Sequence, residues 1–319
     1  MEGGLPQLLP EDFSSIVSGD PEELDVHLQL VQRDVLLEHG AARLHCHILA
    51  VDGNGRVKSE RLAEFMRNSI IDYAVPKSRL DDARTRDAKY KSGSAVAKLH
   101  HEAIGTFTDL ANTGEGGEML LFLLAERFLK IPQVLCKMDL KTDSRMHYHG
   151  ADGVYASVNE DGFLKLYWGE SKVYGDSTAA IRDCLASLAP FLFEKDHEGA
   201  DRERDLVLLS DKADLSNPRL TKAFRKYFDR TSPLSNSVEY CGVALIAFDA
   251  KFYPEDGTKG IAEDILKAAN DEMKNWVKNV NNRLSVEKLD KFDIQLFCVP
   301  VPSAEGFRAS FLKALGIGK

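Results

Sequence analysis

The first hundred residues combine short apolar runs with one helical pattern. Apolar side chains fill residues 28–37 and 44–51, on either side of the turn-like pair His39-Gly40. Both runs predict strands, although the first also permits a helix. After Ser59, a candidate N-cap, apolar residues recur at helical spacing: Leu62, Phe65, Met66, Ile70 and Tyr73. Residues 1–100 therefore predict a smaller α+β domain at the N-terminus.

Residues 77–98 lose this periodicity. They hold seven Lys and Arg residues against three Asp residues, and a polar stretch without periodicity is typical of a loop. We expect a linker or mobile arm between the N-terminal domain and the rest of the chain.

Residues 101–319 predict a second, larger α/β domain. Residues 118–130 are apolar nearly all round, which predicts a buried helix. Short apolar runs at 134–140, 153–158 and 163–173 then predict a three-strand meander, followed by a helix that Asp176 caps. An α/β extension follows, with strands predicted at 206–209, 241–248 and 292–299, and helices at 261–284 and 304–315. The order is helix, three-strand meander, helix, strand, and then the extension.

The 319 residues are 44% hydrophobic, enough to bury a sizeable core. The five cysteines lie far apart and form no CxxC pair, which favours reduced thiols in a cytoplasmic protein over a disulfide framework or a zinc site. The sequence shows neither a secretory signal nor an apolar stretch of the length that crosses a membrane, so we expect no membrane association.

The residues best suited to catalysis lie in the predicted meander. Glu170 and Lys172 are two apart on one strand and therefore share a face. The hairpin brings Asp152, at the mouth of the neighbouring strand, beside them. Two carboxylates and an ammonium group are thus expected to meet where an apolar strand leaves the core.

Adjacent carboxylates in a poorly hydrated site repel each other unless a cation offsets their charge. Mg²⁺ suits this role because it prefers oxygen ligands and often takes only one or two protein carboxylates. Asp152 and Glu170 are the predicted ligands, and Glu118, on the preceding buried helix, could add a third carboxylate directly or through water. Lys172 would position the attacking water and steady charge on a phosphate. The alternative is a solvated strand end, because an Asp followed later by Glu-x-Lys occurs by chance in many proteins.

The order of elements and the Asp152…Glu170-x-Lys172 pattern resemble the PD-(D/E)xK nuclease superfamily. From about Gly114 to the end, the chain further resembles HamA, the nuclease subunit of the Hachiman anti-phage system. Ala151 stands where the superfamily has a Pro before its first Asp. Three segments carry the resemblance: Gly116-Gly117-Glu118, His149-Gly150-Ala151-Asp152-Gly153, and Trp168-Gly169-Glu170-Ser171-Lys172.

The resemblance implies a PD-(D/E)xK-like core and a two-component defence complex. In such a complex a superfamily 2 helicase partner, HamB-like, holds the nuclease and regulates it. It also implies cleavage of DNA with Mg²⁺ or Mn²⁺. The chain itself lacks the GxxxxGK[ST] pattern of an NTP site, which fits a motor on another subunit.

Two other functions stay open: a non-catalytic adaptor that keeps a nuclease-like fold and restrains a helicase, and a stand-alone restriction or repair nuclease. The net charge of −9 is unusual for a protein that grips DNA unaided. Either a partner brings the DNA, or the basic residues are concentrated locally, as in residues 77–98 and 219–230. His147 and His149, just before Asp152, are interpreted as ordinary edge-strand histidines in preference to metal ligands.

Overall fold

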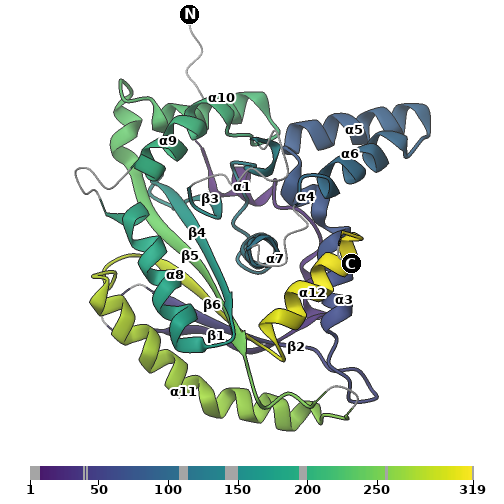
Figure 1. The fold of residues 1–319 in the computed structure, drawn as a ribbon. Helices are drawn as coiled ribbons and strands as arrows, with labels where there is room; N and C mark the ends of the chain where they lie inside the picture. The colour runs from purple at the N-terminus through teal and green to yellow at the C-terminus, as the bar shows by residue number, and fades with distance from the viewer. Residues whose placement is uncertain are drawn as a thin grey trace, which may run out of the picture.

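A six-stranded mixed sheet forms the centre of the computed structural model, which describes residues 8–38, 40, 42–107, 114–140, 150–193, 200–255 and 258–317 (Figure 1). The strand order is β1-β2-β6-β5-β4-β3. The inner strands β2, β6, β5 and β4 run parallel, while β1 pairs antiparallel with β2 and β3 with β4. Parallel strands are stable when both faces of the sheet are covered. The strands are β1 (Leu28–Leu36), β2 (Arg43–Leu49), β3 (Gly153–Val158), β4 (Leu164–Tyr174), β5 (Val238–Asp249) and β6 (Ile294–Val301).

Helices cover both faces of this sheet. α8 and α11 lie on one face, and α7 and α12 on the other (Figure 1). On the α8 face, Phe191 packs against Trp168 of β4, with ring centroids 5.3 Å apart. The helices are α1 (Pro10–Ser14), α2 (Pro21–Asp25), α3 (Ser59–Asn68), α4 (Ile70–Ala74), α5 (Lys77–Tyr90), α6 (Ser94–Ile104), α7 (Glu115–Leu123), α8 (Ser177–Leu192), α9 (Ala200–Lys212), α10 (Pro218–Arg225), α11 (Ala262–Val286) and α12 (Ala304–Leu315).

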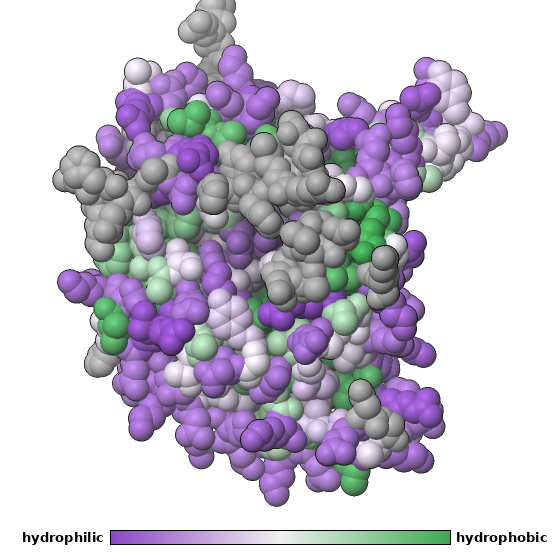
Figure 2. Space-filling model, in the orientation of Figure 1, coloured by the Kyte–Doolittle hydropathy of each residue, from purple (hydrophilic) through white to green (hydrophobic). Residues whose placement is uncertain are grey.

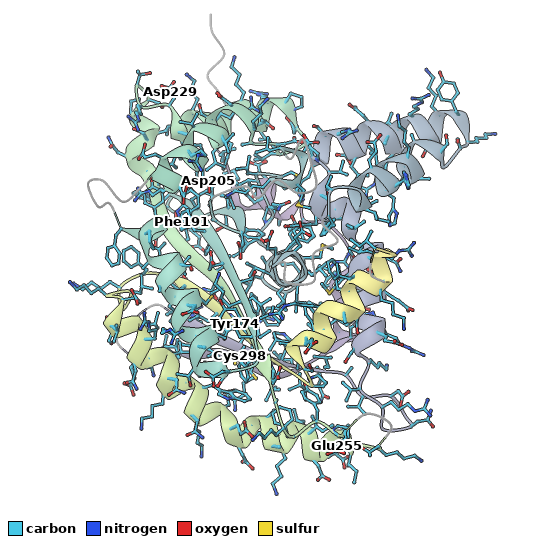
Figure 3. The ribbon with its side chains drawn as sticks, in the orientation of Figure 1. Tyr174, Phe191, Asp205, Asp229, Glu255 and Cys298 are labelled. Carbon is cyan, nitrogen blue, oxygen red and sulfur yellow. The ribbon has the colours of Figure 1, made fainter. Side chains whose placement is uncertain are left out.

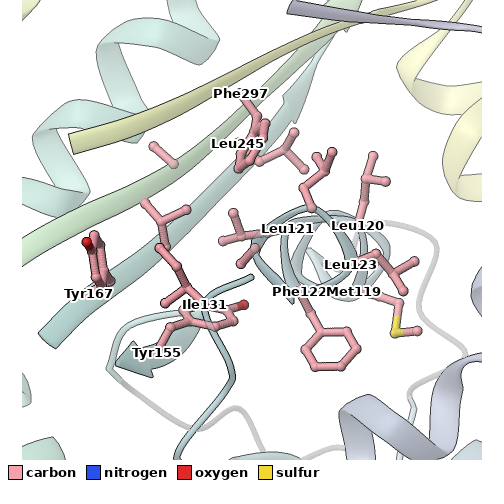
Figure 4. Close-up of a cluster of buried hydrophobic side chains, with 14 of the residues drawn as sticks. Met119, Leu120, Leu121, Phe122, Leu123, Ile131, Tyr155, Tyr167, Leu245 and Phe297 are labelled. Atoms are coloured by element: carbon pink, nitrogen blue, oxygen red, sulfur yellow. The ribbon is translucent and has the colours of Figure 1, made fainter. Parts of the chain in front are cut away.

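Helix α7 is buried along almost its whole length. Residues 119–123 are almost completely excluded from solvent, and Figure 4 shows them packed beside Tyr155, Leu245 and Phe297 of the sheet. The helix continues into a π-helical turn, Leu124–Phe128. The predicted buried helix at 118–130 is thus confirmed, with a start three residues earlier. None of the described helices is both long and apolar enough to span a membrane.

Several local predictions are confirmed. The Asp176 side chain accepts a hydrogen bond from the Ala179 amide at 2.7 Å and so caps α8. Gly316 ends α12 with a positive φ of 73°, a conformation that costs glycine little. The predicted strands at 28–37, 44–51, 241–248 and 292–299 correspond to β1, β2, β5 and β6.

The predicted linker at 77–98 is wrong, because this segment forms the helical hairpin of α5 and α6. Its buried stripe is narrow: Leu80, Ala83 and Asp87 are buried on α5, and Leu99 and Ala103 on α6. Asp87 is polar, which hides the helical period from a hydrophobicity pattern. Its carboxylate accepts hydrogen bonds from the Ala95 and Val96 amides at 3.0 and 2.9 Å, at the start of α6. The hairpin projects from the body, with a mostly hydrophilic surface (Figures 1 and 2).

Two predicted strands are also wrong. Residues 206–209 lie within α9, where Leu209 is buried while Val207 is 60% exposed. A short apolar run does not distinguish a strand from one turn of a helix. Residues 134–140 form no strand either, since the chain makes one bridge, Gln133 with Tyr155, and then turns into a 3-10 helix at Met138–Leu140. The structure therefore has a two-stranded hairpin where we expected a three-strand meander.

The sheet extends across the boundary that we drew at residue 100. β2 pairs with β6 through Arg43–Gln295 to Cys46–Cys298, so strands from both sides of the boundary share one hydrogen-bonded sheet. The division into residues 1–100 and 101–319 itself stays a prediction. The established architecture is a mixed α/β fold around this sheet.

Candidate active site

The start of β3 and the middle of β4 bring the predicted acidic residues together. Gly153 pairs with Gly169 in the antiparallel register, which places Asp152 opposite Glu170. The Asp152 amide donates to the Gly169 carbonyl at 2.8 Å. Asp152 and Glu170 therefore lie next to each other although 18 positions separate them in the sequence.

Glu170 and Lys172 share one face of β4 and form an ion pair between Lys172 Nζ and Glu170 Oε1. The Glu170 side chain is 7% exposed and that of Lys172 is 21% exposed. The same face packs against α8, where the Cys184 thiol contacts the Glu170 carbonyl. The strand alternation that predicted this pairing is borne out by the geometry.

The Asp152 carboxylate is held by Ser171, which lies between Glu170 and Lys172 in the sequence. Its Oδ2 accepts hydrogen bonds from the Ser171 amide and the Ser171 hydroxyl, both at 2.8 Å. These two bonds fix Oδ2 and so orient the Asp152 carboxylate. Ser171 was missed by the sequence analysis because an alternating strand places it on the opposite face from Glu170.

Burial is the main reason why the pKa of Glu170 is raised to about 8, and the neighbouring Asp152 charge raises it further. Burial lowers the pKa of Lys172, but the charge of Glu170, its hydrogen bond with Lys172 and the charge of Asp152 together outweigh burial, so the pKa of Lys172 is raised. The carboxylate of Glu170 is the more deeply buried of the two groups, so the site disfavours its charge more strongly.

Glu118 lies on α7, which packs against the other face of β4. A Cβ atom on the adjacent Gly117 would approach Val173 Cγ2 to 2.9 Å and Ser171 Oγ to 3.2 Å. Glu118 Oε2 accepts a hydrogen bond from the Tyr73 hydroxyl at 3.0 Å. Burial raises the pKa of Tyr73, and the charges of Glu118 and Asp152 raise it further. Tyr73 thus lies near the carboxylates of Glu118 and Asp152. Glu118 is on the same side of β4 as Ser171, opposite to Glu170.

The acidic groups offer oxygen ligands of the kind that Mg²⁺ prefers. Asp152 and Glu170 are close enough for one to raise the pKa of the other. However, no three His, Cys, Asp or Glu side chains among the described residues are grouped tightly enough to hold a metal ion. The arrangement therefore fits a cation with two protein carboxylates and further ligands from water or substrate.

A buried ion pair lies against the backbone of Ala151, immediately before Asp152, and was missed by the sequence analysis. Lys137 Nζ donates to Asp205 Oδ2 at 2.6 Å and to the Ala151 carbonyl at 2.7 Å. Asp205 lies on α9 (Figure 3), and its Oδ2 also accepts from the Ala151 amide at 3.2 Å. Gly150 leaves room for both groups, since a Cβ there would approach Lys137 Nζ to 2.7 Å. The pair clamps the backbone immediately before Asp152.

No pattern in the neighbouring sequence predicts that Lys137 and Asp205 form a pair. Lys137 and Asp205 are 68 positions apart, and both lie in or beside segments that we predicted as strands. Gly150 has a positive φ of 139°, and it is the residue that Lys137 and Asp205 approach closely. In the sequence, however, a glycine does not show which groups approach it. His147 and His149 lie outside the described residues.

Fold and site together define a mixed α/β protein with two carboxylates and a lysine gathered at the β3–β4 junction. The HamA family model matches residues 25–315. The chain therefore belongs to the HamA family, a component of the Hachiman anti-phage defence system. No curated protein matches the chain. The family match includes β1, β2 and the α5–α6 hairpin, which precede the segment on which the resemblance was based.

Proposed function

We propose that this protein is a metal-dependent DNA nuclease, the effector subunit of a defence complex that a superfamily 2 helicase, HamB-like, regulates. The observation that carries the proposal is the meeting of Asp152, Glu170 and Lys172 at the β3–β4 junction. A buried carboxylate with a raised pKa, a second carboxylate beside it and an adjacent ammonium group are typical of a functional site.

In the proposed reaction, water attacks the phosphorus of a DNA phosphodiester, the P–O bond to one sugar breaks, and the leaving sugar oxygen takes up a proton. Asp152 and Glu170 would hold Mg²⁺ or Mn²⁺, and such a cation would make a coordinated water easier to deprotonate and would offset the negative charge of the site. Ser171 orients the Asp152 carboxylate, and the Lys137–Asp205 pair fixes the backbone before it. Lys172 positions the attacking water and stabilises charge on the phosphate. Glu118, on the other side of β4, contributes through water.

The acidic net charge of −9 supports the partner part of the proposal. Phosphate neutralisation by Lys and Arg supplies most non-specific affinity for DNA, and this chain has a deficit of such residues. A helicase that holds the DNA would deliver it to the site. The membership in a two-component defence family makes a stand-alone restriction or repair nuclease the weaker reading.

The test uses Glu170→Gln and Lys172→Ala in the complete chain with its helicase partner. Either variant should abolish DNA cleavage in the presence of Mg²⁺ while leaving partner binding intact. Lys165→Ala is the matched control: Lys165 lies on the same strand, is similarly exposed (24%), and forms an ion pair with Asp293 at 2.8 Å. Wild-type cleavage by Glu170→Gln would place the catalytic site elsewhere.

One observation favours the adaptor as a second candidate. Glu170 is in contact with Lys172, and the described residues include no group of three candidate metal ligands. A non-catalytic adaptor predicts no heat of binding when Mg²⁺ or Mn²⁺ is titrated calorimetrically into the purified chain. The nuclease predicts a heat that Asp152→Asn removes.

A further inference from the structure

The α5–α6 hairpin carries its charges in two different settings. Near its root, the cations are engaged: Arg79 pairs with Glu102 at 2.5 Å, and Arg84 lies 3.5 Å from Asp72. Lys98 also lies near Glu102, at 3.6 Å. These contacts hold the two helices together and hold the hairpin against α4. These three cations therefore already have a structural role.

At the tip the cations lack such partners. Arg86, Lys89 and Lys91 are exposed, and none of them forms an ion pair with another described residue. Tyr90 stands between them with 66% of its surface exposed, and Lys89 Nζ lies 5.3 Å from the centre of its ring. The tip is therefore a local positive patch around an exposed aromatic ring on a protein whose net charge is −9.

The geometry points to DNA: we infer that Arg86, Lys89 and Lys91 bind the phosphate backbone, with Tyr90 against the sugars and bases. Basic residues combined with an exposed aromatic ring are typical of surfaces that follow a nucleic-acid strand. The choice of DNA as the polyanion rests on the proposed function. An acidic surface of the helicase partner is the competing ligand, and the experiment below separates the two.

The root of the hairpin and the neighbouring α4 are joined to α7, the helix that carries Glu118, and to the π-helical turn that follows it. Lys77, the first residue of α5, donates to the fully buried Glu126 at 2.8 Å, and Tyr73 of α4 donates to Glu118. α5 has 14 residues, so at 1.5 Å per residue the tip lies about 20 Å along the helix from its root. DNA held at the tip would therefore be anchored at a fixed distance from the site.

The experiment measures binding of a short fluorescein-labelled DNA duplex to the full chain by fluorescence anisotropy over a range of salt concentrations, without divalent cations. The test variant is Arg86→Gln/Lys89→Gln/Lys91→Asn. Asparagine is chosen because Lys91 has a left-handed backbone, φ 50°, which asparagine tolerates. The control, Lys267→Gln/Lys274→Gln/Lys278→Gln, removes three exposed lysines from α11 and changes the net charge equally.

We expect the hairpin variant to lose about tenfold or more in affinity at low salt, and its slope of log K against log salt to fall by about 3, one for each phosphate contact. The α11 control should keep both the wild-type affinity and the wild-type slope. Equal losses in the two variants would show a general charge effect and overturn the inference.

Copurification with the helicase partner gives the second readout. If the hairpin variant keeps its affinity for DNA but no longer copurifies with the partner, the hairpin docks a protein and the inference is wrong. If wild type binds DNA through the hairpin but cleaves none, the inference stands while the proposed nuclease activity fails.

Discussion

At the scale of single residues, Glu170 is held in a setting that disfavours its charge. Burial and Asp152 raise its pKa from an ordinary 4.5 to about 8. A raised pKa means that the folded protein binds the proton more tightly than the unfolded chain does. The contribution of this proton to stability is therefore complete below about pH 4.5 and is lost as the pH rises through about 8.

This linkage gives a pH prediction for the chain without divalent cations. Between pH 4.5 and 8, Glu170 should make the free energy of unfolding fall as pH rises. Asp152→Asn should make this fall smaller, because it removes the neighbouring charge, and Glu170→Gln should remove the Glu170 part altogether. Thermal melts across this pH range, with Lys165→Ala as control, measure the slopes. An unchanged slope in Glu170→Gln would contradict the raised pKa.

At the scale of elements, the site depends on how closely α7 approaches β4. Gly117 allows this approach, because a Cβ there would press on Val173 and Ser171. Helix α9 matters in a similar way, since it brings Asp205 under the backbone at Ala151. The candidate catalytic groups lie just before β3 and on β4, but contacts with α7 and α9 set the positions of the segments that carry them.

Gly117→Ala tests the contact of α7 with β4. Overpacking in a core costs about 1–3 kcal/mol, so the melting temperature should fall. DNA cleavage should fall with it, because Ser171 would shift and no longer orient Asp152. Gly306→Ala on α12 is the control, since a Cβ there meets Ser303 only at an ordinary 3.4 Å. That change should stabilise by about 0.5–1 kcal/mol. If the Gly117→Ala protein is as stable as wild type, α7 can move away from β4 without loss of stability, and the prediction is wrong.

At the scale of the whole molecule, segments from both ends of the chain join the same structure. β2 lies beside β6 in the sheet. The fully buried Glu126 accepts hydrogen bonds from Lys77 at 2.8 Å, from the Gln133 amide at 2.7 Å and from the Ser18 amide at 2.6 Å. Removing one partner of a buried ion pair costs about 3–5 kcal/mol.

A chain of residues 101–319 alone is therefore expected not to fold cooperatively. It would expose the edge of β6 and leave Glu126 without Lys77 and Ser18. Near-UV circular dichroism during a thermal melt, compared with the full chain, makes the measurement. A cooperative melt of the shortened chain would instead establish residue 100 as a true domain boundary. For the same reason, partner docking is better tested by changes in the hairpin than by deletion of residues 1–100.

Patterns that are local in the sequence were enough for much of this protein. Strand alternation placed Glu170 and Lys172 on one face, the hairpin turn brought Asp152 opposite Glu170, and caps such as Asp176 and Gly316 marked where helices begin and end. Each of these depends on the geometry of a few consecutive residues. The long apolar run in α7 predicted burial for the same reason.

Tertiary structure alone decided the rest. Asp87 is buried on α5 because its carboxylate accepts hydrogen bonds from the first turn of α6. Residues 206–209 are part of a helix, which places Asp205 and Leu209 on one face, where both are buried. Lys137 reaches Asp205, and Tyr73 reaches Glu118, from segments far away in the chain. Burial, and with it the raised pKa of Glu170, comes from contacts between distant elements, which no stretch of neighbouring residues contains.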